Sequence, residues 1–433
     1  MINENEYRVL LELTASGLSQ SADEFMSQHD YSAYQRWAFS PSNAQLDRWL
    51  KITGVIQSVH LTMTILRPLL SETEWERLLP YTVYMNIYMG YEVVSDNLGI
   101  GVAYSTDLTV QQRLSVLFDF NEAMVARLAG NHDLAVQVLN SLEQRAKNIS
   151  TFEQSLAPDK HRAIAQLYAA QFSEAVIANL EYALMPLLIS NVESCYKLAT
   201  ITDTLQIGPI VRESLSKRYI AVNELIRETP DTLDQLLTLS ADAILVVPIL
   251  AYYLGVLCEI INVQTTFYVV VDDGSLKSAL YHAALLVRLL NDMGALVVCS
   301  TEECEGLVKS LSECAIDTGF TTLNELIVGI GDRFGAIWTR IQKDAQFGEF
   351  NLVLNGLGCL VPNSKTFSEL QHRLEHLCVT YTTHQKSLEE DLGYIESTMG
   401  NNIASSIVRY FVQFHERMYL NLYTTSAGEY TVG

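Results

Sequence analysis

Apolar residues recur at intervals of three and four along most of the 433-residue chain, which is the spacing of one face of an α-helix. The spacing is most regular after Thr366, at positions Leu370, Leu374, Leu377, Tyr381, His384, Leu388, Leu392 and Ile395. Such a seam predicts a long helix packed against a neighbouring helix. Because helical spacing dominates throughout, we expect an all-α fold, a single large helical bundle of about a dozen helices around an apolar cavity.

Capping residues mark the ends of one early helix. Ser71 and Glu74 have the spacing of a capping box, so a helix is expected to begin at this point. Pro80 is expected to kink or restart this helix, which continues to about Asn97, and Gly99 is expected to end it.

Three segments depart from simple amphipathic spacing. The segment from Pro158 to Met185 is expected to form one long helix, with Pro158 in its first turn. The most apolar segment, Ala243 to Cys258, has fewer than the roughly 20 residues that a membrane-spanning helix needs, so we expect a buried core helix and no membrane span. The run from Thr265 to Val271 is rich in β-branched and aromatic residues, but a lone strand has no partner. An extended connection, or the end of the preceding helix, is therefore favoured over a strand.

Composition narrows the class of protein. Apolar residues make up 49% of the chain and charged residues 18%, which is typical of a folded globular protein. We expect one all-α domain over residues 1–433, with residues 1–70 as a candidate N-terminal helical extension packed on it. The net charge of −22 disfavours binding to nucleic acid or to an anionic membrane surface, because both rely on Lys and Arg. A magnesium-bridged phosphate substrate is compatible with this charge.

The cysteines and the N-terminus favour a cytoplasmic protein. The seven cysteines are scattered and form no CxxC pair, so we expect reduced thiols. The first residues include acidic side chains and no basic region before a short apolar run, so no secretory signal is expected. The oligomeric state is left open by the sequence, and a homodimer is one state that we consider.

The segment from Tyr281 to Thr301 places three polar residues inside an otherwise apolar helix. Arg288 lies three and four residues before Asn291 and Asp292, so all three side chains can point into one cavity. Polar groups in such a position need partners. A carboxylate, an amide and a guanidinium together could hold a cation and a phosphate. The alternative is a structural ion pair between Arg288 and Asp292.

The five residues RLLND, Arg288 to Asp292, resemble the start of the second metal motif of class I terpene synthases. In that family Ser or Thr stands three residues after the Asp, and Glu stands four residues further on. These positions are Ala295 and Cys299 in this chain. The resemblance implies that Asn291 and Asp292 ligate magnesium and that Arg288 lies near the diphosphate of a prenyl substrate.

An early helix carries a second candidate metal motif. Glu92 and Asp96 are four residues apart, so they share a helix face and could ligate a hard divalent cation. The segment around them resembles the Asp-rich motif of the same family in position and polarity, although it lacks an Asp-Asp pair. The alternative is a solvated helix end. The true Asp-Asp pair, Asp272 and Asp273, precedes Gly-Ser and is better explained as a turn or helix cap.

Basic residues supply candidate diphosphate contacts. A local basic cluster consists of Arg212, Lys217, Arg218 and Arg227. Arg218 is nominated from this cluster because Arg can bind a diphosphate with two parallel hydrogen bonds, although the cluster could equally be a surface face paired with acidic residues. Arg417 and Tyr419 resemble the basic and tyrosine contacts that the family makes with diphosphate near its C-terminus. The pair Arg409–Tyr410 competes for this assignment.

Two other patterns are compatible with metal chemistry. His372 to His376 spells HxxEH, the order of an inverted zinc protease motif, but few residues follow it to supply a third ligand. Glu369 and His372 spell ExxH, which is half of a di-iron site. Chance is the favoured explanation of both.

These observations lead to one expected function and two alternatives. We expect a magnesium-dependent cyclase of the class I kind acting on a linear prenyl diphosphate, with Arg288, Asn291 and Asp292 as its catalytic residues. The first alternative is a non-catalytic helical binding or scaffold protein, such as a degenerate relative of the cyclases. A helical metal-dependent oxidase, built on Glu369 and His372, is the second alternative.

Overall fold

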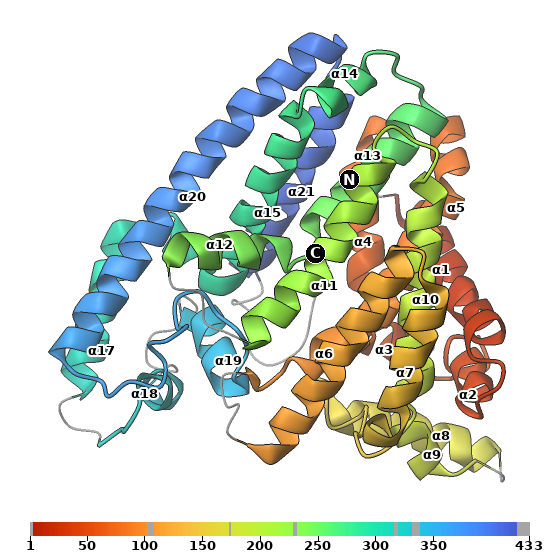
Figure 1. Ribbon diagram of the computed structural model, residues 1–433, viewed down its shortest axis with the longest axis horizontal. Coiled ribbons are helices and arrows are strands. Elements are labelled where there is room, and N and C mark those ends of the chain that lie inside the picture. Colours follow the sequence, from red (N-terminus) through yellow and green to blue (C-terminus); the bar gives the residue numbers. More distant parts are fainter. Residues whose placement is uncertain are drawn as a thin grey trace. The chain divides into compact units, whose positions relative to one another are not determined.

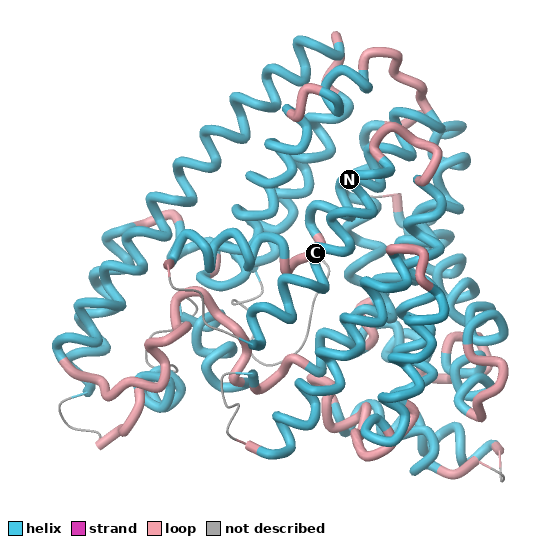
Figure 2. The backbone as a smooth tube through the Cα atoms, in the orientation of Figure 1, coloured by secondary structure: helices cyan, strands magenta, loops and turns pink. Residues whose placement is uncertain are grey.

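The computed structural model describes residues 3–102, 107–172, 175–227, 232–315, 319–330 and 338–421. These residues form helices and connecting loops without a β-strand, as Figure 2 shows. The fold has about 20 packed helices and is 79% helical. The predicted all-α class is therefore confirmed, and the helices are more numerous than the dozen expected, because short turns divide several of the long periodic segments.

The helices group into two compact units. The first unit contains residues 1–100, 106–220 and 251–265, and the second contains residues 101–105, 221–250 and 266–433. Residues 1–70, expected as a candidate extension, belong to the first unit, in which α1 and α4 pack on α5. The single-domain organisation stays a prediction.

In the described part of the chain, fourteen helical segments lie wholly or partly in the first unit, and Figure 1 labels its α-helices. They are α1 (Glu4–Phe25), α2 (Tyr31–Ala38), α3 (Leu46–Ile52), α4 (Val55–Leu66), the 3₁₀ turn η1 (Arg67–Leu69), α5 (Glu72–Leu98), α6 (Leu108–Leu128), α7 (His132–Ala146), α8 (Pro158–Gln171), α9 (Ile177–Glu181), α10 (Leu184–Thr202), α11 (Gly208–Arg227), α13 (Val246–Gly255) and the π-helix η3 (Val256–Ile261). The second unit contains α12 (Leu233–Asp242), α14 (Phe267–Asp272), α15 (Ser275–Met293), α16 (Ala295–Val298), α17 (Thr301–Ala315), α18 (Leu323–Ile330), α19 (Thr339–Phe347), α20 (Ser364–Met399) and α21 (Ile403–Asn421), together with the C-terminal end of α11 and the start of α13.

Helix α5 is the central helix of the first unit and packs on α1, α4 and α10. Ser71 and Glu74 form the predicted capping box at its start, and Gly99 ends it. The helix continues through Pro80 without interruption, so the expected restart does not occur. Gly17 on α1 permits the close approach of α1 to α5, because a Cβ atom at that position would lie 2.8 Å from the Cδ1 atom of Ile87.

Helix α20 is the longest helix of the second unit and lies beside α15 (Figure 1). The Asn363 side chain caps it by accepting hydrogen bonds from the backbone N–H groups of Lys365 and Thr366. The predicted seam is confirmed, because all of its positions are buried except His384, which is half-buried. Helices α14, α17 and α21 also pack on α20.

Two expectations about local structure are wrong. The run from Thr265 to Val271 is neither extended nor part of the preceding helix, because most of it forms the separate helix α14, whose Phe267 and Val270 are buried three residues apart. The segment expected to be one long helix from Pro158 is divided into α8, α9 and the start of α10. Trp37 donates a hydrogen bond from Nε1 to the side chain of Gln171, the last residue of α8, at 3.0 Å.

Two other expectations about local structure are confirmed. The most apolar segment lies in α13 and η3, and most of its side chains are buried. Asp273 acts at a helix end, because its carboxylate accepts a hydrogen bond from the backbone N–H of Ser275 at 2.9 Å. Among the described helices, none alone has the length and apolar composition to cross a membrane, whereas the bent pair of α12 with α13–η3 meets those two criteria.

Candidate functional site

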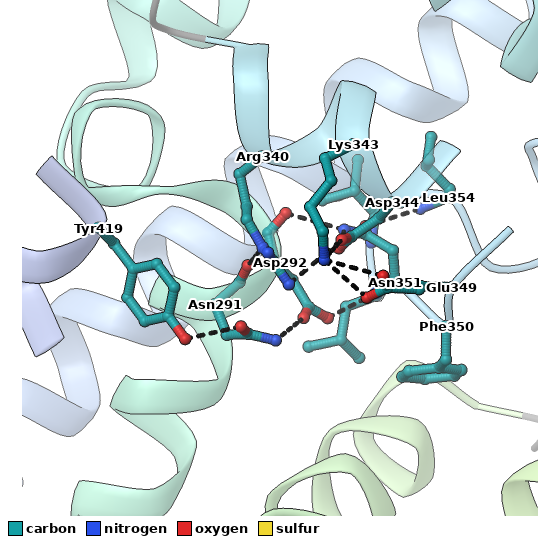
Figure 3. Close-up of polar contacts among 12 residues, drawn as sticks. Asn291, Asp292, Arg340, Lys343, Asp344, Glu349, Phe350, Asn351, Leu354 and Tyr419 are labelled. Atoms are coloured by element: carbon teal, nitrogen blue, oxygen red, sulfur yellow. Dashed lines mark hydrogen bonds and ion pairs between the residues drawn. The ribbon is translucent and has the colours of Figure 1, made fainter. Parts of the chain in front are cut away.

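The residues around Asp292 form a buried polar cluster in the second unit (Figure 3). We call this set the Asp292 cluster: Arg288, Asn291, Asp292, Arg340, Asp344, Asn351, Leu352 and Tyr419. Its members come from α15, α19, α21 and the irregular segment that follows α19. In Figure 3, Tyr419 lies on one side of Asn291, and Asp344 and Asn351 lie on the other.

Asp292 is fully buried at the end of α15, and donors engage both of its carboxylate oxygens. Arg288 lies 2.7 Å from Oδ1 through Nη2 and donates to Oδ2 through Nε at 3.1 Å. The Asn291 side chain donates to Oδ1 at 3.2 Å, and the backbone N–H of Leu352 donates to Oδ2 at 2.8 Å. The Arg288–Asp292 ion pair that the helical spacing suggested is therefore present. It is also completed by a backbone donor that the sequence did not indicate.

Asn351 joins this carboxylate to a second one. Its Nδ2 atom donates to the backbone carbonyl of Asp292 and to Oδ2 of Asp344, both at 2.8 Å. Its Oδ1 atom accepts a hydrogen bond from the backbone N–H of Val353 at 2.9 Å. Arg288 also donates to the backbone carbonyl of Phe350 at 3.2 Å. These bonds attach the irregular segment after α19 to the end of α15.

Asp344 is also buried, but one of its carboxylate oxygens lacks a hydrogen bond, unlike those of Asp292. Arg340 lies 3.2 Å from its Oδ1 atom and Lys343 lies 3.8 Å away, but Oδ1 has no hydrogen-bond partner of acceptable geometry. Burial raises the pKa of Asp344 to about 6, against the opposing effect of Arg340.

Tyr419 reaches Asn291 across 128 positions of sequence and donates from its hydroxyl to the Asn291 Oδ1 atom at 2.7 Å. Burial raises the pKa of Tyr419 to about 12, so the hydroxyl is a hydrogen-bond donor at neutral pH. Arg417, the other nominated residue on α21, is exposed and donates to the backbone carbonyl of Gln413 on its own helix. The structure therefore brings together Arg288, Asn291, Asp292 and Tyr419, and does not bring Arg417 to them.

A second buried polar cluster lies in the first unit, on α5, α10 and α11. We call this set the Glu92 cluster: Tyr88, Glu92, Ser95, Asp96, Asn191, Arg218 and Tyr219. It contains three of the residues nominated from the sequence, which are Glu92, Asp96 and Arg218.

Side chains from two other helices hold the Glu92 carboxylate. The Asn191 side chain donates to Oε2 at 2.9 Å, and the Tyr219 hydroxyl donates to the same oxygen at 2.8 Å. Arg218 lies 3.2 Å from Oε1 and also pairs with Asp96, whose side chain is 56% exposed. Asp96 is therefore the solvent-exposed carboxylate of the cluster, and Glu92 is the buried one.

Burial raises the pKa of Glu92 to about 7, although Arg218 acts in the opposite direction. Three buried polar atoms of the cluster also lack a hydrogen-bond partner: Oε1 of Glu92, Oδ1 of Asn191 and Nε of Arg218. Buried polar atoms are usually satisfied, so these three neighbouring side chains are the part of the cluster whose hydrogen bonds the protein itself leaves incomplete.

The two clusters differ in how well they fit a magnesium ion. Hard cations prefer oxygen ligands, and Glu92, Asp96 and Asn191 offer two carboxylates and an amide. Oε1 of Glu92 and Oδ1 of Asn191 accept no hydrogen bond, and Oε1 is held only by its ion pair with Arg218. Asn291 and Asp292 would have to lose hydrogen bonds that they already make before their oxygens could bind a metal ion. Among the described residues, no group of three or more His, Cys, Asp and Glu side chains has the arrangement of a metal site. Asn191 would therefore have to be one of the ligands.

The remaining nominated residues lie apart from these clusters. Arg212 pairs with Asp203 and Lys217 pairs with Glu213, whereas Arg218 pairs with the buried Glu92 and the half-exposed Asp96. The basic cluster of the sequence is therefore divided. His372 is 80% exposed in its side chain and lies 3.9 Å from Glu375 of its own helix.

Asn191, Tyr219 and Asn351 were missed by the sequence analysis. The one available signal for Asn191 is its position in an apolar helix, where a buried amide needs a partner. Nothing in the sequence links these residues to Glu92 or Asp292.

Comparisons with known proteins found no relative of this chain. No family model, no curated protein and no solved structure matches the chain. The only guide to the function of the two clusters is therefore their own chemistry.

Proposed function

We propose that the protein ionises a linear prenyl diphosphate with the help of magnesium and cyclises the resulting carbocation, as class I terpene cyclases do. The observation that carries the proposal is the grouping of the residues nominated by resemblance. All of them except Arg417 belong to one of two buried clusters, and each cluster joins an arginine to a carboxylate. Tyr419 also supports the proposal, because the fold brings its hydroxyl to Asn291 although the two nominated residues are 128 positions apart.

The Glu92 cluster supplies the groups that ionisation requires. Glu92, Asp96 and Asn191 would hold magnesium, which acts as a Lewis acid on the diphosphate. Arg218 can donate two parallel hydrogen bonds to the leaving diphosphate. The buried rings of Tyr88 and Tyr219 exclude water and present aromatic faces, which stabilise cations.

The Asp292 cluster, taken by itself, also offers groups that could bind a diphosphate. Arg288 and the Tyr419 hydroxyl are hydrogen-bond donors, and both lie beside Asn291 and Asp292. Preorganised donors of this kind stabilise charge that develops on a leaving group. Asn291 and Asp292 remain the predicted magnesium ligands of this cluster.

A specific observation favours a second function, that of a non-catalytic helical binding or scaffold protein. Both oxygens of Asp292 are already used by Arg288, Asn291 and the Leu352 backbone, which is typical of a structural network. In that case the cluster serves to hold the irregular segment in place. No contact among the described residues favours the oxidase.

Incubation with prenyl diphosphates separates the two functions. Purified protein is mixed with geranyl, farnesyl or geranylgeranyl diphosphate in the presence of magnesium or of a chelator, and diphosphate release and hydrocarbon products are measured. We expect a cyclic product that depends on magnesium. Failure to release diphosphate from any of the three would favour the non-catalytic protein.

Matched variants identify the residues responsible. Glu92→Gln and Arg218→Gln should each lower the rate of diphosphate release by about 100-fold, the typical effect of removing one group that stabilises the transition state. Arg417→Gln is the control and should leave the rate unchanged, because Arg417 is exposed and bonds within its own helix. Circular dichroism of each variant verifies that it is folded.

A further inference from the structure

Two buried cysteines face each other between α17 and α20. The Sγ atoms of Cys304 and Cys378 lie 3.6 Å apart, although the two residues are 74 positions apart in sequence. Both side chains are almost inaccessible to solvent, with 0% and 4% exposure. Helices α17 and α20 pack directly on each other, so their backbones already hold the two thiols in contact.

A single backbone carbonyl holds both thiols in place. The Val297 carbonyl oxygen lies 3.5 Å from Sγ of Cys304 and 3.4 Å from Sγ of Cys378. Both sulfur atoms therefore contact the same acceptor and each other. A disulfide needs an S–S distance of about 2.05 Å, which asks for an approach of about 1.5 Å from the present separation.

The contact also favours ionisation within the pair. The hydrogen bond between the two thiols lowers the pKa of Cys378, because it stabilises the thiolate form. Thiolates are the reactive form of cysteine, and the second sulfur of the pair already lies against the first.

We propose that Cys304 and Cys378 are a reversible redox site that forms a disulfide when the protein meets a peroxide. The thiolate of one cysteine attacks one oxygen of hydrogen peroxide, which breaks the O–O bond, gives a sulfenic acid and releases hydroxide. The sulfur of the other cysteine then attacks the sulfenic sulfur, and the S–OH bond breaks as the S–S bond forms. In total, two thiols and one hydrogen peroxide give one disulfide and two water molecules.

This site is separate from the two polar clusters. Cys304 lies on α17, which follows α15 and α16 in the chain, so the disulfide would tie this part of the chain to α20. A cross-link between distant positions restricts the unfolded chain, so the oxidised protein should unfold at a higher temperature than the reduced protein.

The test uses the full chain without any substrate. The protein is treated with hydrogen peroxide, denatured and alkylated, and its peptides are mapped by mass spectrometry before and after dithiothreitol. We expect two fewer alkylated cysteines, one linked peptide joining Cys304 to Cys378, and recovery of both thiols on reduction. The Cys304→Ala and Cys378→Ala variants should each lose the linked peptide.

Exposed Cys359 provides the matched control. Cys359→Ala should retain the linked peptide, because this thiol is not part of the pair. If Cys304 and Cys378 both remain free to alkylate after peroxide treatment, or if Cys378 links to the exposed Cys299 instead, the proposal is wrong. The wild-type peptide map decides this even where an alanine variant folds poorly.

Discussion

Glu92 and Asp292 are both buried carboxylates beside an arginine, but their neighbours leave them in different states. A backbone N–H and an arginine on its own helix hold Asp292, and both of its oxygens are used. Glu92 is held only by side chains from α10 and α11, and its Oε1 atom lacks a hydrogen bond. Burial correspondingly raises the pKa of Glu92 to about 7.

This difference separates a structural role from a chemical one. A carboxylate fixed by backbone donors anchors the chain, because releasing it would also release the segment that supplies the donor. A carboxylate whose partners are all side chains can exchange a partner for a ligand or a proton. The Glu92 cluster is therefore the first place to look for function, and the Asp292 cluster the first place to look for stability.

The largest effect should come from Asp292→Asn. This change leaves the buried Arg288 without its counter-charge and weakens the attachment of Leu352. Breaking a buried ion pair by removing one partner typically costs 3–5 kcal/mol, so we expect a loss of about 4 kcal/mol in the free energy of unfolding, measured in urea. The control is Asp96→Asn, which removes a half-exposed carboxylate and should cost less than about 1 kcal/mol. Equal effects of the two changes would remove the contrast between the clusters.

The next effect concerns pH. The folded-state pKa of Glu92 is about 7, above its ordinary value of 4.5, so between these two pH values the folded protein binds the proton more strongly than the unfolded chain. The free energy of unfolding should therefore fall as pH rises from 4.5 to 7, by about 3 kcal/mol from this group, and then level off.

The Glu92→Gln variant isolates this contribution, because it keeps the size of the side chain and removes the titration. Its free energy of unfolding is compared with that of the wild type at several pH values between 4 and 8. The difference should change across the window and be constant above pH 7. Asp344, whose pKa burial raises to about 6, titrates in both proteins and is removed by the subtraction. A difference that does not vary with pH would show that folding does not change the pKa of Glu92.

A smaller effect is expected from Asn351→Ala. The change removes the donor shared by the Asp292 carbonyl and the Asp344 carboxylate, both of which are buried. Leaving a buried acceptor without a partner typically costs 1–3 kcal/mol, so we expect a loss of about 2 kcal/mol in urea denaturation. Asn355→Ala, at a less buried position of the same segment, is the control and should cost less.

Features that depend on neighbouring residues could be predicted from the sequence. The capping box of Ser71 and Glu74, the seam of α20 and the shared faces of Glu92 with Asp96 and of Arg288 with Asp292 all depend on residues a few positions apart. Helical geometry alone fixes which of these side chains are neighbours. The local propensity of the run around Phe267 was misleading, because burial against α15 and α20 stabilises a helix there.

The partners that decide the two clusters could not be predicted in this way. Asn191 and Tyr219 are 99 and 127 positions from Glu92, and Leu352 is 60 positions from Asp292. The Leu352 donor is a backbone N–H, which every residue except proline carries, so no residue type signals it. The sequence identified the two charged residues, Glu92 and Asp292. The packing of segments that are distant in sequence determines which of the two carboxylates has hydrogen bonds to both of its oxygens.

The smallest expected effect comes from Tyr419→Phe, which removes one hydroxyl from the edge of the Asp292 cluster. Asn291 Oδ1 loses its donor, but the Asn291 side chain keeps its bond to Asp292. The net value of a hydrogen bond is about 1 kcal/mol, so we expect a loss of that size in the free energy of unfolding. Tyr394→Phe is the matched control, because the Tyr394 hydroxyl also donates to a side-chain oxygen, that of Asp273, but at an exposed position. Its removal should change stability by less than about 0.5 kcal/mol. If Tyr419→Phe leaves stability unchanged yet slows diphosphate release, the Tyr419 hydroxyl acts on a substrate, and the Asp292 cluster has a catalytic role beyond anchoring the chain.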